Sequence, residues 1–122
     1  MSDKFHTICI VDDDPSVCKA LSRVIKVAGF NVNSYISSQE FLDDKQRGII
    51  DLLLLDIKMP VMDGFALQDH LSATGIKIPI VFMSAHEVDK TRGKIMGKTG
   101  VAFLQKPFDE KDLLEAIAKN LK

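Results

Sequence analysis

The chain has 122 residues, 46% hydrophobic and 27% charged, with a formal net charge of −1, which predicts one globular domain and excludes disordered and fibrous classes. This near-neutral charge gives no reason to expect nucleic acid or an anionic membrane as the default partner. No hydrophobic signal region precedes Thr7, and no apolar run approaches the roughly 20 residues that span a bilayer. Only two cysteines occur, which is weak evidence for disulfides. We therefore expect a soluble, reduced, cytoplasmic protein.

The first third of the chain predicts a strand, a helix and a second strand. The run from Thr7 to Val11 is β-prone and ends at a group of three aspartates. Asp14 can cap a helix that Pro15 begins, because the fixed φ of proline suits the first helical position, and Gly29 supplies a stop. Residues 30–35 then give a weaker strand signal.

The middle of the chain repeats this order. Ser37 and Glu40 form a capping box, which opens a short helix that we expect to extend to about residue 47. Residues 49–55 hold four consecutive leucines between a glycine and a proline. Such an unbroken apolar run fits a strand covered on both faces, with a buried helical segment as the alternative. A third helix follows a turn and ends near Gly75.

Two further strand–helix pairs complete the series. Residues 78–83 and 101–104 predict two more strands, and an apolar stripe after Asp109 predicts the last helix. Residues 87–98 predict a fourth helix that contains two glycines, each of which costs about 1 kcal/mol relative to alanine. We therefore expect this helix to be marginal and mobile.

The alternation of strands and helices predicts the fold class. Strands that alternate with helices form a parallel sheet with right-handed crossovers and helices on both faces. The expected fold is α/β: a three-layer sandwich whose five-stranded parallel sheet has the order 2-1-3-4-5, with five helices, in the flavodoxin-like doubly wound arrangement.

Polar residues follow four of the five predicted strands at their carboxyl ends. They are, in chain order, Asp12, Asp13, Asp56, Ser84 and Lys106. In an open parallel sheet ligands bind beyond these ends, at the point where the strand order reverses, so we expect the five side chains to meet. Carboxylates without His or Cys ligands suit a hard cation, and Mg²⁺ is usual where phosphate is handled, with Mn²⁺ as an alternative. Because an aspartate can act as a nucleophile and form an acyl phosphate, the pattern predicts phosphoryl transfer.

Four stretches of the sequence together resemble the receiver domains of two-component response regulators. They are residues 10–15 (IVDDDP), 55–64 (LDIKMPVMDG), 83–85 (MSA) and 103–108 (FLQKPF). The resemblance covers essentially the whole chain, and residues 38–42 (SQEFL) with the ending KPF are similar to the FixJ-type group. It implies a single receiver domain, residues 1–122, which we expect to be a fragment of a longer regulator, with a stand-alone receiver as the alternative.

The resemblance implies a metal site and an acceptor. Asp12 and Asp13 would be the acidic pair that holds Mg²⁺, and Asp56 with the backbone carbonyl of Lys58 would complete the site. Asp56 would be the phosphoacceptor, which takes phosphate from the phosphohistidine of a kinase. The protein would be a signalling switch rather than an enzyme, since it would catalyse only its own phosphorylation and dephosphorylation.

The resemblance also implies switch residues. Ser84 and Lys106 would bind the phosphoryl group, Phe103 would be the aromatic switch that turns inward, and the peptide bond before Pro107 would be cis. A conformational change would follow at the face formed by the fourth helix, the fifth strand and the fifth helix, and would control an output domain or a target protein. We further hypothesise that two loop residues tune the lifetime of the phosphorylated state. These are Lys58 and His86.

The resemblance identifies partners only by class. The phosphate donor would be a sensor histidine kinase or a histidine phosphotransfer protein. No membrane partner is expected, and nucleic acid would be bound only through a C-terminal domain beyond Lys122, such as the DNA-binding helix-turn-helix that FixJ-type proteins often carry.

Three other functions fit parts of the pattern. A metal-dependent phosphohydrolase with an aspartate nucleophile would carry a second Asp where this chain has Lys58, and 122 residues leave no room for a cap domain. A flavin or dinucleotide binder would need a Gly-rich loop where this chain has residues 12–15, which would repel phosphate without a metal. A phosphorylation-independent receiver relative would usually lack one of the five site residues, and all five are present.

Overall fold

The structure, a computed structural model, describes residues 5–84 and 102–121. Five strands and four helices occur in these residues. The strands are β1 (Thr7–Val11), β2 (Asn31–Tyr35), β3 (Leu52–Asp56), β4 (Ile80–Ser84) and β5 (Ala102–Gln105). The helices are α1 (Pro15–Val27), α2 (Ser38–Asp43), α3 (Gly64–Ala73) and α5 (Glu110–Asn120).

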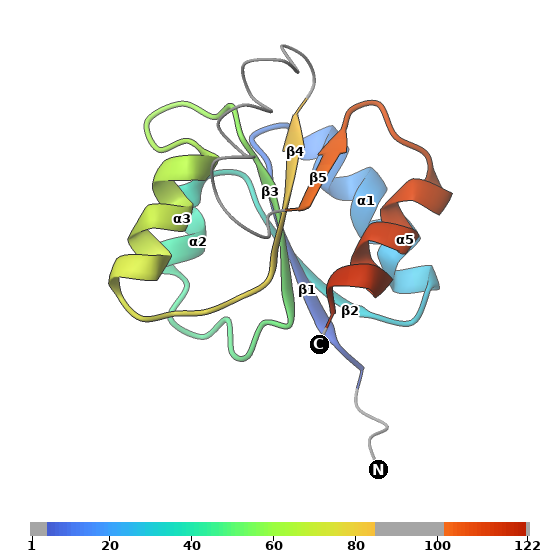
Figure 1. The fold of residues 1–122 in the computed structure, drawn as a ribbon, viewed down its shortest axis with the longest axis horizontal. Helices are drawn as coiled ribbons and strands as arrows, with labels where there is room; N and C mark the ends of the chain where they lie inside the picture. Colours follow the sequence, from blue (N-terminus) through green and yellow to red (C-terminus); the bar gives the residue numbers. More distant parts are fainter. Residues whose placement is uncertain (1–4, 85–101, 122) are drawn as a thin grey trace.

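All neighbouring strands are parallel, and their order is β2-β1-β3-β4-β5. Helices α1 and α5 cover one face of the sheet, and α2 and α3 cover the other (Figure 1). The predicted α/β sandwich and its strand order are therefore confirmed. The helix expected at residues 87–98 lies outside the described residues.

The consecutive leucines of β3 contribute to both layers of the core. Alternate residues of a strand point to opposite faces of the sheet. Leu53 and Leu55 accordingly pack in the cluster with Phe41 of α2, while Leu52 and Leu54 pack in the opposite cluster. All four leucines are fully buried, as expected for a central strand covered on both faces.

Helix α2 is shorter than the sequence predicts. The capping box forms, since Ser37 Oγ accepts a hydrogen bond from the N–H of Glu40, but the helix ends at Asp43 rather than near residue 47. Asp44 accepts one hydrogen bond from the N–H of Gln46 and another from the Tyr35 hydroxyl, at 3.0 and 2.6 Å. This local side-chain turn competes with helical hydrogen bonding, so the prediction of a longer helix was wrong.

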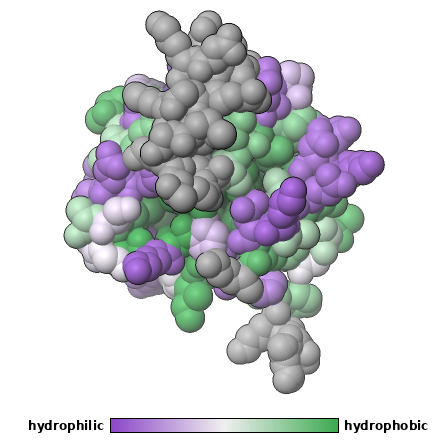
Figure 2. Space-filling view, viewed as in Figure 1, coloured by the Kyte–Doolittle hydropathy of each residue, from purple (hydrophilic) through white to green (hydrophobic). Residues whose placement is uncertain are grey.

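Two strand boundaries also differ from the prediction. Strand β3 begins at Leu52 rather than at residue 49. The Asp51 side chain accepts a hydrogen bond from the N–H of Thr7 in β1, and Ile49 is exposed. Strand β4 covers Ile80–Ser84 rather than residues 78–83. Hydrophilic and hydrophobic side chains are interspersed over α3 and α5 on the face seen in Figure 2. Among residues 5–84 and 102–121, no helix is long and apolar enough to cross a membrane.

Candidate functional site

Acidic side chains meet at the carboxyl end of the sheet. Asp12 directly follows β1 and Asp56 ends β3, the adjacent strand, whose following helix packs on the opposite face. This is the point where the strand order reverses and where ligands of such sheets bind. One carboxylate oxygen from each of Asp12, Asp13 and Asp56 lies within 4.8 Å of the others. The structure thus brings together the three aspartates that the sequence singled out.

Asp12 is held rigidly in this cluster. Its side chain is buried, and Oδ1 accepts a hydrogen bond from the N–H of Asp14 at 3.0 Å. Oδ2 accepts a second from Lys106 Nζ at 2.6 Å. The N–H of Asp12 donates to the carbonyl of Tyr35 in β2. These bonds fix the Asp12 carboxylate, whereas Asp13 is exposed and can reorient toward an incoming ion.

Lys106 lies between two carboxylates. Its Nζ is 2.6 Å from Asp12 Oδ2 and 3.5 Å from Asp56 Oδ1. Burial opposes the charged form of Lys106, but the hydrogen bond with Asp12 and the charge of Asp56 outweigh it and raise its pKa. The backbone N–H of Lys106 donates to the carbonyl of Ser84 at 2.7 Å, which places the lysine at the ends of β4 and β5.

Asp56 is the most perturbed acid of the cluster. Its side chain is only 8% exposed. Burial, followed by the nearby charge of Asp12, raises its pKa from 3.8 to about 6, although Lys106 acts in the opposite direction. Part of its population is therefore protonated near neutral pH, and any added positive charge would favour the carboxylate.

The donor set fits a hard divalent cation. The three carboxylates (−3) and the Lys106 ammonium (+1) leave a formal charge of −2. All the candidate ligand atoms are oxygens, which Mg²⁺ and Mn²⁺ prefer over softer metals. The three carboxylates thus fit the magnesium site that the sequence predicts.

Gly64 brings the first turn of α3 against the backbone of Asp56. Its N–H donates to the carbonyl of Ile57 at 2.9 Å. A Cβ on Gly64 would lie 2.5 Å from the Asp56 carbonyl oxygen, closer than any real contact. The sequence placed this glycine in the stretch 55–64 but gave it no role of its own, although its position directly after the helix cap Asp63 was an available signal. Gly64 thus allows the start of α3 to approach the end of β3 closely.

The remaining predicted residues within the described part of the chain lie on β4, on β5 and in the loops that follow β3 and β5. Ser84 is buried at the end of β4. Phe103 of β5 is half-buried, pairs in register with Phe82 and packs against the core under α2 and α3. The side chain of Lys58 is exposed in the loop after β3, and the Lys106–Pro107 peptide bond is cis. His86 lies outside the described residues.

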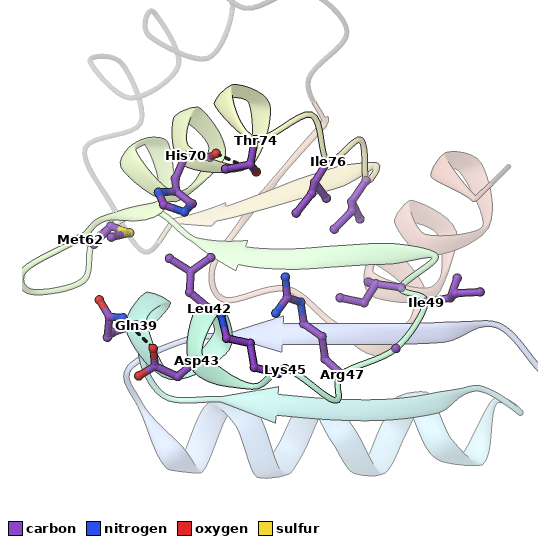
Figure 3. A pocket seen from close by; sticks show the side chains of 13 residues that line it. Gln39, Leu42, Asp43, Lys45, Arg47, Ile49, Met62, His70, Thr74 and Ile76 are labelled. Atoms are coloured by element: carbon purple, nitrogen blue, oxygen red, sulfur yellow. Dashed lines mark hydrogen bonds between the residues drawn. The ribbon is translucent and has the colours of Figure 1, made fainter.

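A cavity of about 820 Å³ lies elsewhere, between α2 and α3 (Figure 3). Its lining includes Leu42, Lys45, Met62, His70 and Ile76, with none of the carboxylates of the acidic cluster. The cavity is therefore separate from the candidate metal site. Met62 nevertheless links its wall to the loop that follows β3.

Comparisons with known proteins agree with this geometry. Residues 8–118 match the family described as "Response regulator receiver domain". The chain is 39% identical over 122 residues to the response regulator protein TodT of Pseudomonas putida, covering 100% of this chain and 54% of that protein. It is 33% identical over 111 residues to the transcriptional regulatory protein TdiR of Thauera aromatica, covering 91% and 49%. The chain thus spans about half the length of these curated relatives.

Solved structures give the same fold. The crystal structure of FixJ-N has a TM-score of 0.85 and 30% sequence identity, covering 96% of this chain and 94% of that one. The chemotaxis protein CheY4 of Vibrio cholerae has a TM-score of 0.87, with 97% and 100% covered, and at 23% identity it supports the fold alone. With the family match over residues 8–118, these findings show that the chain belongs to the response regulator receiver domain family, the phosphorylation switches of two-component systems.

Proposed function

We propose that Asp56 is the phosphoryl acceptor of this receiver domain. The donor is the phosphohistidine of a sensor histidine kinase or of a histidine phosphotransfer protein, and the reaction depends on Mg²⁺, with Mn²⁺ as an alternative. One observation carries the proposal: Asp56 is a nearly buried carboxylate at the end of the central strand, and the Lys106 Nζ that lies 3.5 Å from its Oδ1 is also 2.6 Å from Asp12 Oδ2.

Four groups would hold the cation. These are the carboxylates of Asp12, Asp13 and Asp56 and the backbone carbonyl of Lys58. When bound, the cation supplies positive charge that neutralises the phosphoryl oxygens and orients them for in-line transfer. The added positive charge would also favour the ionised form of Asp56, whose pKa burial and the Asp12 charge raise to about 6.

The reaction joins an Asp56 oxygen to phosphorus while the phosphorus–nitrogen bond of the phosphohistidine breaks. The electron pair of that bond returns to the imidazole of the donor, and Asp56 becomes an acyl phosphate. Lys106, which pairs with Asp12 in the free protein, reorients toward the new phosphoryl oxygens. The Ser84 hydroxyl at the end of the neighbouring strand donates to another of them.

The output follows from the position of Phe103. As Ser84 is drawn toward the phosphoryl group, space opens near the half-buried Phe103 ring, which turns inward and changes the β5–α5 face. This face would control an output domain or a target protein in the cytoplasm. Lys58 and His86 would tune the lifetime of the acyl phosphate. TdiR is named a transcriptional regulatory protein. By analogy, we propose that the output of this receiver is control of transcription.

Intact mass measurement after incubation with acetyl phosphate tests the proposal. We expect one phosphoryl adduct on the wild type that requires Mg²⁺ and is absent from Asp56→Asn. Asp112→Asn, which removes an exposed carboxylate of α5, is the matched control and should keep the adduct. An adduct that persists on Asp56→Asn, or a wild type that takes up neither phosphate nor beryllofluoride, contradicts the assignment. Continuous phosphate release without a trapped adduct would instead indicate a hydrolase.

A further inference from the structure

The loop between β3 and α3 contains a strained turn. The N–H of Met62 donates to the carbonyl of Pro60 at 2.8 Å, and Val61 between them has φ +69°. A three-residue turn with a positive central φ is rare and strained. A β-branched residue is especially unfavourable there, because its side chain crowds the backbone. The Val61 side chain is fully exposed, so its own packing does not compensate for the strain.

A buried hydroxyl holds this turn from another element. Ser38 lies on the inward face of α2 together with Phe41, and it is 2% exposed. Its Oγ donates to the carbonyl of Met62 at 3.0 Å, across 24 positions of the chain. A buried hydroxyl lowers stability unless it is hydrogen-bonded. The Met62 carbonyl therefore accounts for a polar residue at a position where helix packing favours an apolar one.

The strained turn belongs to the loop that leads away from the acceptor. This loop starts directly after Asp56, carries Lys58, and ends where Gly64 contacts the Asp56 backbone. Both of its ends are thus fixed on β3, and the side chain of Met59 is buried between them. If the turn at Val61 relaxes, the backbone between these two fixed ends has to move, and this segment includes Lys58.

We propose that Ser38 is a positioning residue of the phosphorylation site, whose hydroxyl holds the strained Pro60–Met62 turn and thereby fixes the Lys58 carbonyl in the position that binds the cation. This role rests on the proposed function of the site. Strained backbone persists only where its surroundings determine it. Without the hydroxyl the loop populates a relaxed form, and the apparent affinity for Mg²⁺ falls by the fraction of molecules that remain competent.

The test measures Mg²⁺ affinity by amide chemical-shift titration of the 122-residue chain. One hydrogen bond of ordinary net strength predicts that Ser38→Ala weakens Mg²⁺ binding about 2- to 10-fold. Ser37→Ala is the matched control, because the Ser37 hydroxyl caps the same helix by accepting from the N–H of Glu40, while the bond to the Met62 carbonyl comes from Ser38. It should leave Mg²⁺ affinity unchanged. Amide exchange at Met62 should accelerate in Ser38→Ala alone.

A second substitution separates positioning from plain stability. Val61→Gly removes the strain at φ +69°, because glycine adopts positive φ readily. The relaxed form of the loop is then no longer lower in free energy than the bound form. Ser38→Ala in that background should therefore no longer weaken Mg²⁺ binding. An equal loss in both backgrounds, or an equal loss in Ser37→Ala, overturns the proposal and makes Ser38 a structural residue. If the wild type itself bound no Mg²⁺, the proposed function of the site would be wrong. That result is distinct from failure of the Ser38 proposal, which requires a wild type that binds Mg²⁺.

Discussion

Neutralising Asp56 should stabilise the metal-free protein, and the gain should depend on pH. A pKa of about 6 in place of 3.8 means that the folded state disfavours the carboxylate. Each unit of pKa corresponds to about 1.4 kcal/mol, so the ionised Asp56 costs the folded state about 3 kcal/mol at neutral pH. Asp56→Asn removes this charge with almost no change in shape. We therefore expect Asp56→Asn to raise the free energy of unfolding by about 2 to 3 kcal/mol at pH 7.5.

The direction of the pH dependence follows from proton binding. Between the unfolded pKa of 3.8 and the folded pKa of about 6, folded Asp56 retains a proton that the unfolded chain has released. The contribution of Asp56 to the stability of the wild type therefore falls as the pH rises through this window, and the full penalty remains above it. The advantage of Asp56→Asn should be near zero below pH 3.8 and complete above pH 6.

Urea unfolding followed by circular dichroism measures this difference, since the chain has no tryptophan. The experiments are performed in EDTA at several pH values between 3.5 and 8. Glu115→Gln is the control, because Glu115 is an exposed carboxylate on α5 outside the cluster, and its removal should change stability little at any pH. An Asp56→Asn variant that is no more stable than the wild type at pH 7.5, or whose gain is independent of pH, would refute the reasoning.

Three other substitutions test neighbouring contacts. Gly64→Ala should destabilise the protein by about 1 to 3 kcal/mol in urea unfolding, because its Cβ would meet the Asp56 carbonyl oxygen at 2.5 Å. Tyr35→Phe should lower stability at pH 7, and the loss should shrink as the pH falls, because the Tyr35 hydroxyl is the main cause of the lowered pKa of Asp44. Lys106→Met should destabilise the metal-free protein at neutral pH, since it leaves the Asp12 and Asp56 charges uncompensated, and added Mg²⁺ should recover stability.

The fold was predictable because its signals are local and repeated. The alternation of apolar runs with amphipathic segments determines the layers, and the four leucines of β3 identify the strand that both layers cover. The candidate site followed from a topological rule, since residues after parallel strands meet at one edge of the sheet. Neither inference needed a side-chain contact to be known in advance.

The features that the sequence did not predict depend on contacts between distant segments. Helix α2 stops early partly because Tyr35, in a strand, donates to Asp44. The hydrogen bond between Ser38 and Met62 joins α2 to a loop 24 positions away. Burial sets the pKa of Asp56, and periodicity does not report how deeply a strand end is covered. Such contacts arise only once the layers have packed.

Unfavourable features of this protein concentrate at one end of the sheet. The acidic cluster with its formal charge of −2 and the positive φ of Val61 lie at the carboxyl ends of the strands, while the leucines of β3 are fully buried between the layers. A ligand that binds only the folded state stabilises it. Uncompensated negative charge strengthens the attraction for a cation, so the stabilisation on cation binding is larger. Asp56→Asn relieves part of that repulsion without a cation. The same substitution that raises stability in EDTA should therefore reduce the further gain on adding Mg²⁺, which links the repulsion within the acidic cluster directly to its affinity for the ion.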